Sequence, residues 1–136
     1  MYCQPLPKLY VDGCAFHTTE NGERKLVALA GIVWGSDYHI QPVGYCLGPK
    51  SSQMAELSTV YKAIQMEVNQ GFKEFVIITD SDYVRNSFAE YLPVWKHNQI
   101  TRARNKPVKH GKMILAIDDI VISNDLIVFW KKTKGH

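Results

Sequence analysis

Long apolar runs and a full set of cysteine pairs are both missing from this sequence. No apolar stretch in its 136 residues approaches the roughly 20 residues needed to cross a bilayer. The opening residues, Met1 to Pro5, lack the pattern of a secretory signal. The three cysteines, Cys3, Cys14 and Cys46, leave one over if paired and show no metal-ligand spacing, which favours reduced thiols. We therefore expect an intracellular protein of the cytoplasm or nucleus, neither secreted nor embedded in a membrane.

Internal repeats and low-complexity segments are also absent. Apolar residues make up 46% of the chain and charged residues 21%, which is typical of a folded protein. At this length we expect one domain over residues 1–136, with residues 1–7 as an N-terminal extension. The net charge is only +3, but it is unevenly distributed. Residues 92–116 contain no acid and carry six cations: Lys96, Arg102, Arg104, Lys106, Lys109 and Lys112.

This basic segment, residues 93–112, is expected to protrude from the domain and has two interpretations. Solvated protein surfaces often carry such runs of charge. A run of one sign also indicates a polyanionic partner such as a nucleic acid.

Hydrophobic periodicity predicts strands over three leading segments: Lys8 to Phe16, Leu26 to Trp34 and Tyr38 to Leu47. A polar loop from Thr18 to Glu23 is expected to join the first two as a hairpin. Pro42 and Gly44 indicate that the third strand lies at a sheet edge or contains a bulge.

Helices and strands alternate in the rest of the chain. Ser51 or Ser52 is expected to cap a helix that ends at Gly71. Its apolar stripe consists of Met54, Leu57, Tyr61, Ile64 and Val68. The later elements are a buried strand from Glu74 to Thr79, a helix from Asp80 to Leu92, a helix from Met113 to Val121 and a strand from Leu126 to Trp130. This order predicts an α/β fold with helices packed on a mixed sheet.

Two aspartates, Asp12 and Asp80, follow apolar strand-like runs, and Glu56 lies on the predicted helix between them. Right-handed crossovers would bring the ends of the first and fourth strands together near the middle of the sheet. Acids gathered in apolar surroundings repel one another unless a cation lies among them, and oxygen ligands favour a hard divalent ion such as Mg²⁺. Taken singly, Asp80 also fits a helix N-cap, and Glu56 also fits a favourable interaction with a helix macrodipole.

Four motifs occur in order along the chain: Val11-Asp12-Gly13-Cys14, Ser52-Gln53-Met54-Ala55-Glu56-Leu57, Ile78-Thr79-Asp80-Ser81-Asp82-Tyr83-Val84 and Lys134-Gly135-His136. At this spacing they resemble the successive signatures of type 1 ribonuclease H. The similarity covers residues 9–136 and is strongest to the ribonuclease H domain of gammaretroviral or spumaviral reverse transcriptases, or to a host protein derived from a retroelement. It implies a ribonuclease H-like fold, with a five-stranded mixed sheet and helices on both faces.

The resemblance also implies roles for individual residues. Asp12, Glu56 and Asp80 match three of the family's four metal-binding carboxylates. His136 matches a histidine that assists proton transfer or product release. Residues that match substrate-binding positions, including the cations of the basic segment, are Gly13, Cys14, Ser51, Ser52, Gln53, Lys96, Arg102, Arg104, Lys106, Lys109 and Lys112.

The sequence departs from the family pattern in two places. Cys14 stands where the family usually has Ser or Ala, a small change that preserves the turn. The fourth aspartate and the last helix, which follow the histidine in relatives, are missing from this chain. We do not expect another acid to replace that aspartate; the candidates are Asp82, Asp118, Asp119 and Asp125.

The resemblance implies that the activity is hydrolysis of the RNA strand of an RNA/DNA hybrid. Two Mg²⁺ ions are the expected cofactors, and Mn²⁺ can replace them. With three carboxylates, weak or undetectable cleavage by the isolated chain is expected at millimolar Mg²⁺. The expected partners are the hybrid and a reverse transcriptase polymerase domain or integrase in the same polyprotein. A viral origin would add the virion as a location.

Three other interpretations remain. A nucleic-acid-binding or scaffold domain without catalysis is favoured by the missing fourth carboxylate but leaves the other three unexplained. Integrases and transposases share the architecture but carry their glutamate on a late helix, whereas Glu56 precedes Asp80. An unrelated α/β domain would require a separate explanation for each motif.

Overall fold

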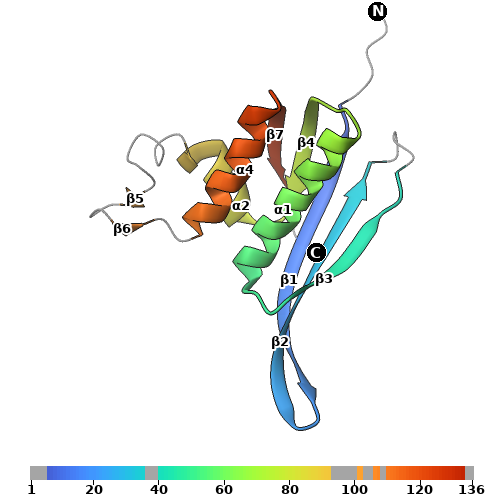
Figure 1. The fold of residues 1–136 in the computed structure, drawn as a ribbon, viewed down its shortest axis with the longest axis vertical. Helices are drawn as coiled ribbons and strands as arrows, with labels where there is room; N and C mark the ends of the chain where they lie inside the picture. The colour runs from blue at the N-terminus through green and yellow to red at the C-terminus, as the bar shows by residue number, and fades with distance from the viewer. Residues whose placement is uncertain (1–5, 36–39, 93–100, 103–105, 108–109, 134–136) are drawn as a thin grey trace, which may run out of the picture.

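A five-stranded mixed sheet forms the centre of the molecule in the computed structural model, which describes residues 6–35, 40–92, 101–102, 106–107 and 110–133. The strand order is β3-β2-β1-β4-β7. β1 pairs antiparallel with β2 and parallel with β4; β2 pairs antiparallel with β3, and β4 parallel with β7. The strands are β1 (Lys8–Glu20), β2 (Glu23–Trp34), β3 (Val43–Gly48), β4 (Glu74–Thr79) and β7 (Ile127–Lys132). The predicted α/β fold with a five-stranded mixed sheet is confirmed (Figure 1).

The hairpin between β1 and β2 is longer than the sequence analysis predicts. The expected loop from Thr18 to Glu23 is wrong, because the strands continue to Glu20 and from Glu23. Asn21 and Gly22 make the turn with φ values of 53° and 82°. Asn-Gly is the residue pair that adopts positive φ most readily in a two-residue hairpin turn. The strands therefore project well beyond the helices (Figure 1).

β3 is an edge strand, as Pro42 and Gly44 indicate. Its start is later than predicted: Ile40 to Pro42 are not in a strand, and pairing begins at Val43. Proline has no N–H for a strand ladder, which explains why pairing begins just after it. A register shift opposite Ala28 and Leu29 lies between Cys46 and Gly48 on β3 and is separate from Pro42 and Gly44.

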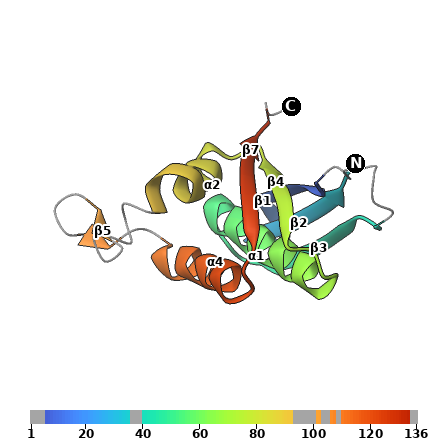
Figure 2. The same ribbon diagram turned by 90° about the horizontal axis from the view of Figure 1, so that it is seen from above.

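Two helices, α1 (Ser52–Asn69) and α4 (Gly111–Ser123), lie side by side on one face of the sheet (Figure 2). Ser51 is the N-cap of α1, and its hydroxyl accepts a hydrogen bond from the Met54 N–H at 3.2 Å. The chain leaves α1 through Gly71, whose φ of 86° suits glycine. α4 is two residues longer at each end than the predicted helix.

The predicted helix from Asp80 to Leu92 starts two residues late and ends where predicted: α2 (Asp82–Asn86) continues without a break into a π-helical turn, η1 (Ser87–Tyr91), and ends at Leu92. Ser81, and not Asp80, is the N-cap: its hydroxyl accepts from the Val84 N–H at 3.2 Å. Asp80 therefore has no capping role in this structure. α2 and η1 lie beside β7, and Phe88 of η1 stacks on Trp130 with ring centroids 4.5 Å apart.

The core lies between the sheet and the two long helices. Its fully buried side chains come from both layers: Leu9, Ile32, Leu57, Ile64, Phe75, Ile77, Ile114 and Ile117. A buried polar contact crosses this interface, where Trp34 Nε1 donates to Glu67 Oε1 at 2.6 Å. Among the described residues, no helix combines the length and apolarity needed to span a membrane.

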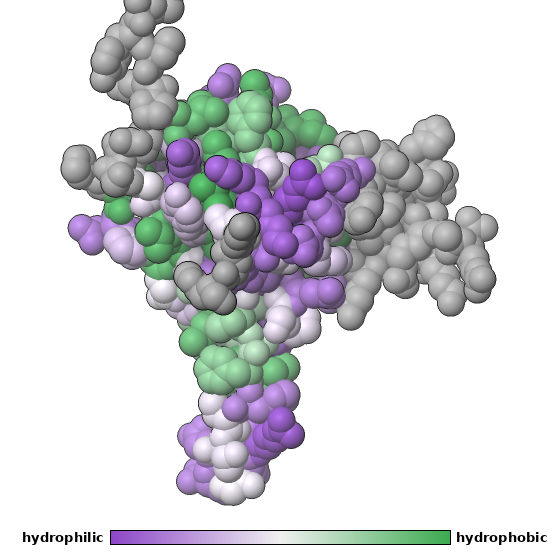
Figure 3. Space-filling view, turned by 180° about the vertical axis from the view of Figure 1, so that it is seen from behind, coloured by the Kyte–Doolittle hydropathy of each residue, from purple (hydrophilic) through white to green (hydrophobic). Residues whose placement is uncertain are grey.

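The opposite face of the sheet, called the open face here, carries no helix among the described residues. Six large apolar side chains on it are 39–50% exposed: Tyr10, Phe16, Leu29, Val33, Ile127 and Phe129. Figure 3 views this face and shows hydrophilic groups gathered across its middle, with apolar surface above and below them.

Candidate functional site

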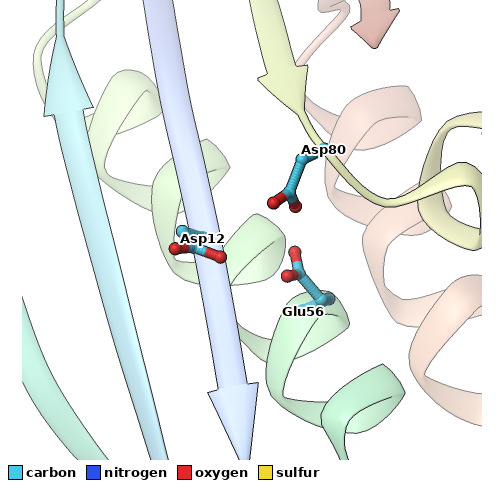
Figure 4. A group of neighbouring side chains, drawn as sticks. All are labelled: Asp12, Glu56 and Asp80. Atoms are coloured by element: carbon cyan, nitrogen blue, oxygen red, sulfur yellow. The ribbon is translucent and has the colours of Figure 1, made fainter. Parts of the chain in front are cut away.

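The candidate site lies where β1 and β4 separate. Their pairing ends at Tyr10 and Ile78. β1 then continues with β2 alone, and β4 ends at Thr79. Asp12 and Asp80 each lie just beyond the last pair and face the opening (Figure 4). Binding sites in α/β folds often lie at such an opening, where two neighbouring parallel strands stop pairing and their chains continue in different directions.

Local hydrogen bonds position Asp80 at the end of β4. The Thr79 hydroxyl accepts from the Ser81 N–H at 3.0 Å, and the Thr79 carbonyl accepts from the Thr133 N–H at 2.9 Å. Ser81 then starts α2 as its cap. Asp80 is therefore held in a short turn between two ordered elements and remains exposed to solvent.

Gly13 allows Glu56 to reach the opening from α1. A Cβ atom at Gly13 would lie 2.5 Å from the carbonyl carbon and oxygen of Ala55 and 2.6 Å from the Glu56 nitrogen. Any larger residue would push the first turns of α1 away from the sheet. The glycine after Asp12 is thus required by the close approach of the helix, because only glycine leaves space for that backbone.

The three acids converge from three elements. One carboxylate oxygen from each of Asp12, Glu56 and Asp80 lies within 4.8 Å of the others. Asp12 and Asp80 are exposed, whereas Glu56 is only 7% exposed. Figure 4 shows the three carboxylates directed toward a common centre between β1, α1 and the end of β4.

The surroundings of Glu56 raise its pKa from 4.5 to about 7. Burial is the main cause; a hydrogen bond from the Gly13 backbone opposes it, and the negative charges of Asp12 and Asp80 raise the pKa further. Glu56 Oε2 is buried and has no hydrogen-bond partner among the described residues. A divalent cation would satisfy this oxygen and offset the repulsion, and a donor set of oxygens alone suits a hard ion. The residues present therefore fit a divalent metal.

The ribonuclease H family model matches residues 7–136. This chain belongs to the ribonuclease H family. It is 29% identical to human ribonuclease H1 over 129 residues, which cover 94% of the chain and 43% of that protein. The chain thus spans less than half the length of the mammalian ribonuclease H1 proteins that it matches.

Solved structures place this ribonuclease H chain with the retroviral members. The ribonuclease H domain of prototype foamy virus superposes with a TM-score of 0.77 at 26% identity, covering 96% of this chain and 79% of that one. A foamy viral protease-reverse transcriptase in complex with an RNA/DNA hybrid superposes with a TM-score of 0.73 at 27% identity, covering 97% and 18%. The retroviral resemblance proposed from the motifs is confirmed.

Five predicted substrate-binding residues of the ribonuclease H chain lie around the carboxylates. Gly13 and Cys14 follow Asp12 on β1, and Cys14 is exposed. The start of α1 packs on Gly13 and brings three more residues to this end of the sheet: Ser51, Ser52 and Gln53. Ser51 and Ser52 are exposed and Gln53 is half-buried, so all three are accessible beside the site.

The basic segment is only partly described. Lys112 is exposed in the first turn of α4. Arg102 and Lys106 belong to a short two-stranded ladder, β5 (Thr101–Arg102) and β6 (Lys106–Pro107), and only their backbone is described. The remaining predicted residues lie outside the described part of the chain: Lys96, Arg104, Lys109 and His136.

Within the described residues, a fourth acid does not join the three carboxylates. Asp82 is the nearest in sequence, but its Oδ1 pairs with Lys132 Nζ at 2.7 Å. Asp118 and Asp119 lie on α4 and Asp125 follows it, and none of the three belongs to the carboxylate cluster. No pattern in the sequence indicates Lys132, because its contact with Asp82 depends on the register between β4 and β7.

Proposed function

We propose that this chain is an endonuclease that hydrolyses the RNA strand of RNA/DNA hybrids. The observation that carries the proposal is the convergence of Asp12, Glu56 and Asp80 within 4.8 Å around a buried, unpartnered carboxylate oxygen. Membership of the ribonuclease H family supports the reaction class. The hybrid-bound foamy viral relative supports the choice of substrate.

We propose Mg²⁺ as the resident ion, in two copies, with Mn²⁺ as a substitute. When bound, such ions supply an activated water and stabilise the departing 3′ oxygen. Asp12 would contribute to both ion positions, with Glu56 and Asp80 completing the ligation. The part played by the protein is to hold the three oxygens in place and to exclude water from the Glu56 side.

The accessible residues beside the carboxylates would select the substrate. Ser51, Ser52 and Gln53 at the start of α1 would contact the minor groove, where 2′-hydroxyl groups distinguish RNA from DNA. Gly13 and Cys14 would lie under the cleaved strand. The cations of the basic segment would contact phosphates without reading sequence, and His136 would assist proton transfer or product release.

Cleavage of a labelled RNA/DNA hybrid tests this proposal, with double-stranded RNA and double-stranded DNA as controls, over a range of Mg²⁺ and Mn²⁺ concentrations. Asp80→Asn retains the shape of the side chain and removes its charge. We expect it to abolish cleavage without loss of the folded state in circular dichroism. Full hybrid cleavage by this variant would refute a catalytic role for the site.

A second candidate is a domain that binds hybrid with weak or no cleavage. It is favoured by one observation: within the described residues only three carboxylates form the cluster. Thermal unfolding with and without Mn²⁺ separates the candidates, because ion binding to the native state raises the midpoint. A midpoint unaffected by millimolar Mg²⁺ and Mn²⁺ would favour the binding domain. In either case, a reverse transcriptase polymerase domain or an integrase in the same polyprotein is the proposed neighbour.

A further inference from the structure

Two consecutive lysines end β7 beside the carboxylate site. β7 runs parallel to β4, and its register pairs Lys131 with Ile78 and Lys132 with Thr79. The Thr133 N–H donates to the Thr79 carbonyl at 2.9 Å, which holds the end of β7 against the point where the chain turns toward Asp80. Both lysines are exposed. The two lysines therefore lie on the strand next to β4, which leads to the candidate metal ligand Asp80.

The two lysines have different surroundings. Successive side chains of a strand point to opposite faces, so Lys131 and Lys132 diverge. Lys132 Nζ forms an ion pair with Asp82 Oδ1 at 2.7 Å, so the positive charge of Lys132 already has a partner. Lys131 lies on the open face, as do its strand neighbours Phe129 and Ile127. Among the described residues Lys131 has no ion-pair partner.

The open face is also the side from which Asp12 and Asp80 are accessible. The alternation along β1 places Tyr10 and Asp12 on this face, with Leu9 and Val11 buried beneath the helices. Ile78 pairs with Lys131, and Asp80 follows Ile78 by two residues. Adjacent strands about 4.8 Å apart and a two-residue step of about 6.6 Å place the Lys131 and Asp80 backbones roughly 8 Å apart. A lysine side chain can therefore extend toward a phosphate bound at the carboxylates.

A positive charge at Lys131 would favour binding of a polyanion beside the three carboxylates. Three carboxylates repel a polyanion wherever cations do not balance them. Hydrophilic groups gather across the middle of the open face, with apolar surface on either side (Figure 3). A phosphate strand that crosses the carboxylates on this face would meet Lys131 next. Lys132 is directed to the other face and is already paired.

We propose that Lys131 is a substrate-binding residue that contacts a nucleic acid phosphate adjacent to the one held at the carboxylates. The proposal rests on the proposed function, because it assumes that nucleic acid lies on Asp12 and Asp80. It assigns different roles to two neighbouring lysines: Lys131 binds the substrate, whereas Lys132 fixes the start of α2 through Asp82.

The experiment compares Lys131→Ala with matched variants that remove the same charge elsewhere. Lys132→Ala is the neighbour control. Lys73→Ala is the distant control, because Lys73 precedes β4 at the opposite end of that strand and donates to the Asn124 carbonyl at 2.9 Å. Binding of a fluorescent RNA/DNA hybrid is measured by anisotropy with Ca²⁺ in place of Mg²⁺, over a range of KCl concentrations. Thermal midpoints verify that each variant is folded.

We expect Lys131→Ala to weaken binding roughly two- to fivefold at 0.1 M salt. The slope of log affinity against log salt concentration should become shallower by about 0.9, the value for one lost phosphate contact. Lys131→Arg should restore both quantities. In cleavage assays, KM should rise for Lys131→Ala with kcat within about twofold of the unsubstituted chain.

An unchanged salt slope for Lys131→Ala, or an equal change for Lys73→Ala or Lys132→Ala, would overturn the proposal. Its failure is distinguishable from failure of the nuclease proposal. If the unsubstituted chain binds hybrid without cleaving it, the anisotropy series still decides the role of Lys131. If the chain cleaves hybrid and Lys131→Ala behaves identically, only the role of Lys131 is refuted.

Discussion

Replacing the buried glutamate of the carboxylate cluster should stabilise the metal-free protein at alkaline pH. The pKa of Glu56 is raised from 4.5 to about 7 in the folded chain, chiefly by burial. One pKa unit corresponds to about 1.4 kcal/mol, so a rise of this size corresponds to a cost of about 3 kcal/mol when Glu56 is ionised. Glu56→Gln removes that charge and keeps the shape and the oxygen that accepts from Gly13.

The sign of the pH dependence follows from the raised pKa. Between pH 4.5 and about 7 the folded state binds more protons at this position than the unfolded state. The native chain therefore loses stability as pH rises through this window and carries the full cost above it. Relative to the unsubstituted chain, Glu56→Gln should be about 2–3 kcal/mol more stable at pH 8 and nearly equal below pH 4.5.

Urea unfolding in EDTA at pH 4.5, 6 and 8, followed by tryptophan fluorescence, measures this difference. Glu74→Gln on β4 is the matched control, because Glu74 is exposed to solvent and lies outside the carboxylate cluster. A Glu56→Gln variant that is less stable at pH 8, or more stable by the same amount at every pH, would show that ionised Glu56 does not destabilise the folded chain. The same variant should lose hybrid cleavage, so stability and activity would move in opposite directions.

Three further outcomes are expected. Millimolar Mn²⁺ should raise the thermal midpoint of the unsubstituted chain at pH 8 but not that of Glu56→Gln, and equal shifts would place the ion elsewhere. Gly13→Ala should destabilise the fold by about 1–3 kcal/mol in urea unfolding, because its methyl group would lie 2.5 Å from the α1 backbone; unchanged stability would contradict this close approach. Burial raises the pKa of Glu67 above its ordinary value, and the hydrogen bond from the Trp34 N–H opposes that rise. Trp34→Phe removes this N–H, so it should cost about 1–3 kcal/mol, with a larger loss at pH 8 than at pH 5. A loss independent of pH would contradict ionisation of Glu67.

Much of the secondary structure could be predicted from local patterns. Glu74 to Thr79 is the predicted strand without change, because a continuous apolar run bounded by polar residues has few alternatives. Ser51, one of the two serines predicted to cap α1, is the cap, because its hydroxyl accepts a hydrogen bond from a helix N–H. The boundaries that differ have local causes, such as the Asn21-Gly22 turn and the π-helical turn after Asn86.

The sequence predicts the three acids, the elements that carry them and, through right-handed crossovers, the approach of Asp12 to Asp80, but it does not give the distances between the carboxylates. Their convergence depends on how far β1 and β4 stay paired, and that pairing ends at Tyr10 and Ile78. The roles of Gly13 under α1 and of Lys131 beside β4 likewise depend on contacts between segments more than 40 residues apart in sequence. Periodicity carries no information about such distances.

The acidic residues, the apolar segments and their order can be read from the amino-acid sequence alone, because these properties belong to individual residues and their near neighbours. The folded chain adds that Glu56 is buried, that its second oxygen has no partner in the described part of the chain and that the two aspartates lie beside it. Burial and Coulomb repulsion depend on distances in space, and the packing of α1 onto Gly13 sets those distances.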